Sequence, residues 1–172
     1  MGLVDTSWPE VIWQQFGAAI EMLENALAAC PDELWSDRSH RPEFWYLVYH
    51  TLFWLDAYLS ESPAGFATPA PFTLDEMDPA GRLPEKPYTK AELQRYLEHG
   101  RRKCRAVVEA LTDEKARERR RFASFDGSLA ELLLYNMRHV QHHSAQLNLI
   151  LRQTVDSAPA WVAKAKSKYS GE

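Results

Sequence analysis

The fold is decided by residues 44–59, which read FWYLVYHTLFWLDAYL. This run shows no alternation of polar and apolar residues, and it is too long for an ordinary strand. Pro42 lies just before it, and proline is common in the first turn of a helix. The sequence therefore predicts a helix over residues 43–60 that is buried on nearly all sides.

A helix buried all round needs other helices to cover it, and three more segments have helical periodicity. Residues 7–29 place apolar side chains at steps of three and four after the cap pair Ser7 and Glu10. Residues 90–115 follow a capping box made by Thr89 and Glu92, and residues 127–152 form the last amphipathic run. We expect four helices, no β-sheet, and a short terminal helix over residues 160–168.

The connection between the second and third predicted helices is unusually long. It covers residues 60–87, which hold six of the ten prolines of the chain. A long connection does not force its two helices to be antiparallel neighbours, so it permits a four-helix bundle with a crossover. We expect the crossover to pack onto the bundle through some of Phe66, Phe72, Met77 and Tyr88. The predicted fold class is all-α.

Composition narrows the class of protein. A chain of 172 residues with 45% hydrophobic residues fits a single globular domain over 1–172. A net charge of −4 argues against a dedicated nucleic-acid binder, and no apolar stretch is long enough to span a membrane. Two cysteines and no secretory signal favour a cytoplasmic location.

Histidines fall where the core is expected. His50 lies within the apolar run of residues 44–55, so its ring nitrogens need partners. His139 and His143 are four residues apart on one helix, which places them on one face, and that face is otherwise apolar. Three imidazoles can hold a divalent ion and leave one coordination position open. The pattern therefore predicts a metal site made by His50, His139 and His143.

Other interpretations stay open. A lone histidine on an apolar helix is commonly a hydrogen-bonded core residue, and a pair spaced by four also occurs on solvated faces. His142 could replace His139 or His143 as a ligand, or it could donate a hydrogen bond to one of the ligands. His40 and His99 have polar neighbours, and we expect both at the surface.

Residues 138–148, RHVQHHSAQLN, together with residues 49–56, YHTLFWLD, resemble the DinB/YfiT-like superfamily of bacterial helical-bundle metalloproteins. The resemblance implies an up-down-down-up four-helix bundle whose ion, usually zinc or nickel, is held by His50, His139 and His143. Members with known chemistry are thiol-dependent transferases or isomerases. The chain departs from them at Ser144 and Ala145 and in its extra His142.

Three functions follow from these observations. The first is a metal-dependent enzyme that transfers a low-molecular-weight thiol to an electrophile, with the thiol and electrophile as its small-molecule partners. The second is a metal-dependent hydrolase, for which Tyr46, Asp56 and Tyr135 are candidate acid or base groups. The third is a non-catalytic metal-binding bundle that forms a homodimer.

Overall fold

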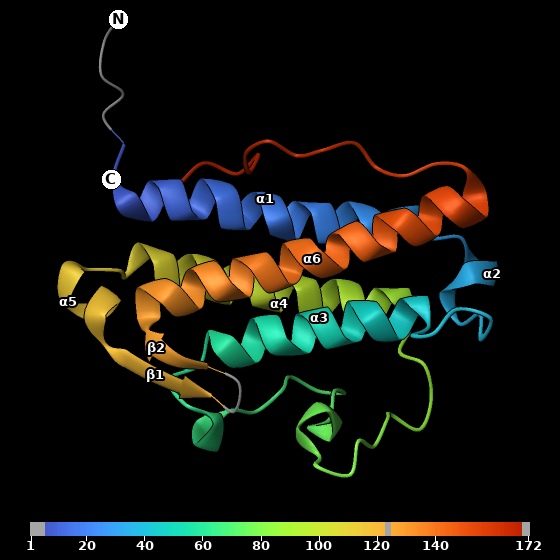
Figure 1. The fold of residues 1–172 in the computed structure, drawn as a ribbon, viewed down its shortest axis with the longest axis horizontal. Helices are drawn as coiled ribbons and strands as arrows, with labels where there is room; N and C mark the ends of the chain where they lie inside the picture. The colour runs from blue at the N-terminus through green and yellow to red at the C-terminus, as the bar shows by residue number, and fades with distance from the viewer. Residues whose placement is uncertain (1–5, 123–124, 170–172) are drawn as a thin grey trace, which may run out of the picture.

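The computed structural model describes residues 6–122 and 125–169, and most of them lie in helices. Four long helices lie side by side: α1 (Trp8–Ala29), α3 (Phe44–Tyr58), α4 (Lys90–Glu109) and α6 (Leu129–Val155). Figure 1 shows α1 and α6 running in one direction and α3 and α4 in the other. Each of α1 and α3 packs against both α4 and α6, so the four helices surround one core.

The helix ends follow from the capping residues. Ser7 accepts a hydrogen bond from the Glu10 amide at the start of α1. Thr89 with Glu92 and Ser128 with Glu131 form complete capping boxes at the starts of α4 and α6. Cys30 and Pro31 end α1, and the short helix α2 (Asp32–Trp35) follows. The predicted starts of the long helices are confirmed to within one or two residues.

The crossover between α3 and α4 contains two short 3₁₀ helices, η1 (Pro63–Gly65) and η2 (Asp75–Met77). Its aromatic residues Phe66, Phe72 and Tyr88 are buried against the bundle, and Met77 packs there partly buried. Phe72 stacks on Tyr96 of α4 with ring centroids 4.3 Å apart. The predicted anchors of the crossover are therefore confirmed.

The expectation of no β-sheet was wrong. The third predicted helix ends at Glu109 rather than 115, and a short helix α5 (Asp113–Arg117) begins after Thr112. Strands β1 (Arg119–Phe122) and β2 (Phe125–Ser128) then pair antiparallel, with Arg121 opposite Asp126. Arg119 and Arg121 both bind the Asp126 carboxylate, Phe122 is buried, and Phe125 packs partly buried in the same cluster, so charge pairing and two aromatic anchors hold the hairpin.

The expected terminal helix over residues 160–168 was also wrong. Residues 156–169 form no regular structure and run back along α1, as Figure 1 shows. Main-chain and side-chain bonds fix this tail: the Ala165 amide donates to Gln14 O at 2.9 Å, and Trp13 Nε1 donates to Ser167 O at 2.9 Å. Among the described residues, no helix combines the length and the apolar character that crossing a membrane requires.

Candidate metal centre

The fold brings His50 of α3 together with His139 and His143 of α6. One ligand nitrogen from each ring lies within 4.8 Å of the other two, so the three side chains form a group that could hold a metal ion. Ring centroids are 5.4 Å apart for His50 and His139, 4.9 Å for His50 and His143, and 4.5 Å for the two α6 histidines. The three residues that the sequence singled out therefore lie together, although they come from two helices.

The spacing of two of these nitrogens fits a tetrahedral ion. His50 Nε2 and His139 Nε2 lie 3.4 Å apart. Two nitrogens that each lie 2.0–2.1 Å from a tetrahedral zinc ion are about 3.3–3.4 Å from one another. The separation of this one pair of nitrogens, from α3 and α6, therefore suits a divalent ion of this kind.

The surroundings keep two of the imidazoles neutral, as a metal ligand must be. Burial, followed by the neighbouring rings of His143 and His50, lowers the pKa of His139 to about 3. Burial also lowers the pKa of His143, against a hydrogen bond to Gln146 that works the other way. Within the described part of the chain, His139 Nδ1 is buried without a hydrogen-bond partner.

Hydrogen-bond partners at Nδ1 hold two of the three histidine rings in place. His50 Nδ1 lies 2.7 Å from Glu76 Oε2, and His143 Nδ1 lies 2.6 Å from Gln146 Oε1. Burial alone would raise the pKa of Glu76, but hydrogen bonds from His50 and Tyr46 outweigh it and hold that pKa below its ordinary value. Sequence reasoning missed Glu76, because it lies in the Pro-rich crossover, where no periodicity relates it to His50.

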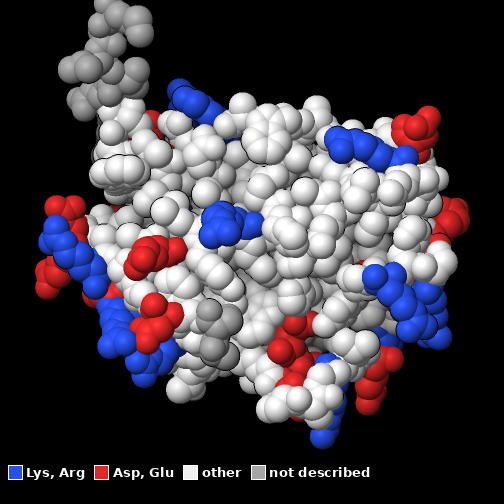
Figure 2. Space-filling model, in the orientation of Figure 1, with Lys and Arg blue, Asp and Glu red and all other residues white. Residues whose placement is uncertain are grey.

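Two hollows flank the three histidines. One, of about 470 Å³, is lined by His50, His143 and Gln146, by the apolar side chains Leu47, Leu149 and Ile150, and by His40 and Arg41. The other, of about 650 Å³, lies over α6 and includes His139, His142, Tyr135 and Trp161. Figure 2 shows few charged side chains over the middle of the face that carries α6. A small molecule can therefore approach the histidines from solvent.

The remaining histidines take different places. His142 is exposed and lies outside the group of three, although its ring centroid is 5.1 Å from that of His143. His40 lines the smaller hollow. The expectation that His99 is only a surface residue was incomplete: its side chain is 36% exposed, but its Nε2 lies 3.3 Å from the fully buried Asp56.

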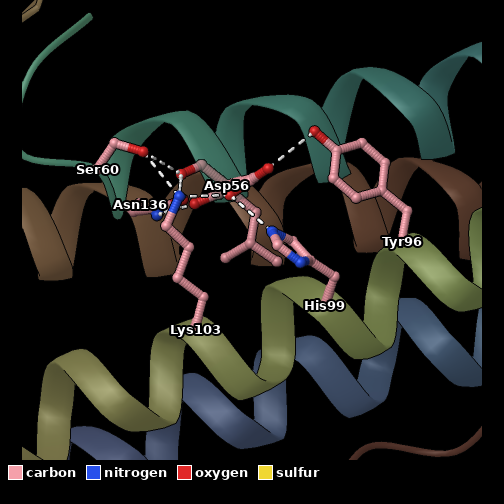
Figure 3. Close-up of polar contacts among 7 residues, drawn as sticks. Asp56, Ser60, Tyr96, His99, Lys103 and Asn136 are labelled. Carbon is pink, nitrogen blue, oxygen red and sulfur yellow. Dashed lines mark hydrogen bonds and ion pairs between the residues drawn. The ribbon is translucent and has the colours of Figure 1, made fainter. Parts of the chain in front are cut away.

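Asp56, a candidate acid or base, faces α4 rather than the histidines. Its carboxylate accepts from Tyr96 at 3.2 Å and pairs with Lys103 Nζ at 2.5 Å (Figure 3). Lys103 also donates to Ser60 Oγ at 2.7 Å, and Asn136 donates to the neighbouring Leu55 carbonyl. This buried cluster joins α3 to α4, and its carboxylate is occupied by these partners.

The other two candidate groups lie nearer the histidines. Tyr46 donates to Glu76 Oε1 at 2.5 Å, and burial together with that carboxylate raises its pKa. Tyr135 lines the larger hollow and meets the rings of Tyr58 and Phe125 edge-on or tilted. A raised pKa makes Tyr46 a poor general base at neutral pH.

Comparison with known proteins gives one match. A model of the DinB superfamily matches residues 15–147, which include all three histidines and most of the four long helices. Searches of curated proteins and of solved structures gave no match. The matched region covers well over half of the chain and contains the helices that supply the histidines. The chain belongs to the DinB superfamily.

Proposed function

We propose that this chain is a metal-dependent enzyme that acts with a low-molecular-weight thiol, in the manner of an S-transferase. The observation that carries the proposal is the grouping of three ligand nitrogens within 4.8 Å of one another beside an open hollow. Three protein ligands leave a position for a further ligand, which is the arrangement of catalytic rather than purely structural sites.

The charge of the ligand set favours a thiol. Three neutral imidazoles would leave a zinc or nickel ion its full double charge, and such an ion favours an anionic further ligand. When bound, the ion would lower the pKa of a thiol so that a thiolate exists at neutral pH. The residues that would hold it are His50, His139 and His143.

The chain itself supplies orientation and a place for the second substrate. Glu76 and Gln146 hold the rings of His50 and His143 through their Nδ1 atoms. The hollow beside them, about 470 Å³ in volume, falls within the range of small-molecule sites. Leu47, Leu149 and Ile150 offer apolar contact to an electrophile, and Arg41 in the same lining offers a positive charge to an anionic group.

The test uses cobalt in place of the native ion. Addition of a small thiol to the cobalt-loaded protein is expected to produce a sulfur-to-metal charge-transfer absorption, which His143→Ala abolishes. His142→Ala is the matched control, since His142 is the adjacent exposed histidine, and it is expected to keep the absorption. Metal-dependent cleavage of simple esters with no such absorption would replace this function by that of a hydrolase. Cobalt binding with neither property would indicate a non-catalytic bundle.

A further inference from the structure

The crossover places one buried carboxylate next to the group of three histidines. Glu76 lies on η2, and its side chain is only 6% exposed. Its Oε1 accepts from the Tyr46 hydroxyl at 2.5 Å, and its Oε2 accepts from Trp54 Nε1 at 3.0 Å and faces His50 Nδ1 at 2.7 Å. All three neighbours belong to α3, so Glu76 connects the crossover to the helix that carries the first histidine.

This arrangement determines where His50 carries its proton. Glu76 already accepts hydrogen bonds from the Tyr46 hydroxyl at Oε1 and from Trp54 Nε1 at Oε2, so its carboxylate acts toward its neighbours as an acceptor. His50 Nδ1 must therefore be the N–H that donates to Glu76. The lone pair of the neutral ring is then on Nε2, the atom that lies 3.4 Å from His139 Nε2.

We propose that Glu76 is the positioning residue of the metal centre, fixing the tautomer and ring orientation of His50 so that Nε2 is free to bind the ion. This inference rests on the proposed metal site and extends it, because it makes the crossover a part of that site.

A purely structural role would be to hold the crossover against the bundle. The crossover has other anchors for that purpose: Phe66 and Phe72 are buried, and the Tyr49 hydroxyl donates to Thr73 O at 3.0 Å. Loss of the Glu76 side chain therefore leaves several contacts of the crossover in place. The bond to His50 is the contact of Glu76 that reaches the histidine group.

The test compares Glu76→Ala, Glu76→Gln and the control Asp75→Asn, which changes the neighbouring carboxylate on the same short helix. Zinc affinity is measured by competition with a chromophoric chelator on untagged protein. Glu76→Ala is expected to lose about 10–100-fold in zinc affinity, the usual cost of removing such a partner. Glu76→Gln is expected to recover most of that loss, since an amide oxygen can still accept from His50. Asp75→Asn should match the unmodified protein within about twofold.

A second readout needs no metal. Nitrogen-15 NMR of the metal-free protein is expected to show His50 protonated on Nδ1, and Glu76→Ala is expected to shift the ring toward the other tautomer. A folded Glu76→Ala variant with unchanged zinc affinity would overturn the inference, as would a His50 proton found on Nε2 in the unmodified protein. If the unmodified protein binds no zinc, the proposed function fails, and the tautomer of His50 still decides the role of Glu76. If Glu76→Ala does not fold, the nitrogen-15 NMR of His50 in the unmodified protein decides the role of Glu76.

Discussion

Replacing Lys103 with methionine tests what the buried cluster between α3 and α4 contributes to stability. Lys103 Nζ lies 2.5 Å from one oxygen of Asp56, a residue with no exposed surface, and it donates to Asp56 O at 2.9 Å and to Ser60 Oγ at 2.7 Å (Figure 3). Methionine keeps most of the apolar stem but removes the charge. The Asp56 carboxylate would keep only Tyr96 and His99 as partners among the contacts described.

The loss of stability expected for Lys103→Met lies between the loss from breaking a buried ion pair and the loss from breaking an exposed one. Breaking a fully buried pair costs about 3–5 kcal/mol, because one charge is left unpaired, whereas exposed pairs contribute about 0–1 kcal/mol. The Lys103 side chain is 27% exposed, so water can reach part of the space it leaves. We expect Lys103→Met to lower the free energy of unfolding by about 2–3 kcal/mol.

The assay is urea unfolding followed by tryptophan fluorescence. Arg102→Met is the matched control, since Arg102 is exposed on the same helix, and its effect should stay within about 0.5 kcal/mol. Adding Asp56→Asn to Lys103→Met should recover part of the loss, because the unpaired charge is then gone. Equal stability of Lys103→Met and the control would refute the assignment of Asp56 and Lys103 as a stabilising pair.

Three further predictions concern the histidines and the tail. The metal-free protein should lose stability as the pH falls from 6.5 toward 3, because the unfolded chain protonates His139 near its ordinary pKa of 6.5 while the folded chain holds that pKa at about 3. The slope is at most about 1.4 kcal/mol per pH unit for this proton, and His139→Gln should flatten it in urea unfolding at several pH values. Gly17→Ala should speed hydrogen exchange of the Ala165 amide, because the new Cβ would lie 2.7 Å from Ala165 Cβ, while α1 keeps its helicity. His142→Ala should leave zinc affinity within about twofold in a chelator competition, because His142 lies outside the group of three; a larger loss would make it a ligand.

Much of the helical framework could be predicted from sequence because its signals are local. The apolar run of residues 44–59 and the capping pairs at Ser7 and Thr89 identify where three of the long helices lie and begin. The hairpin could not be predicted in this way. Its strands have no apolar alternation, and Arg119 and Arg121 of β1 pair with Asp126 of β2.

The candidate site, too, could be predicted from sequence only in part. His139 and His143 share a face of one helix, so their spacing alone brings them together, and His50 is the histidine of the apolar run that completes the group. Glu76 and the partners of Asp56 could not be predicted, because their contacts span from 22 to 47 positions of sequence and no repeating pattern relates them. Only the packing of the crossover and of α4 against α3 makes these contacts.

His50, His139 and His143 are proposed to bind one divalent ion together. Titration of untagged, metal-free protein with zinc against a chromophoric chelator tests it most directly. We expect one tightly bound zinc per chain, with most of the affinity lost in His139→Ala, since two histidines leave the ion largely to water. Absence of zinc binding at one equivalent, or binding that His139→Ala leaves unchanged, would contradict it.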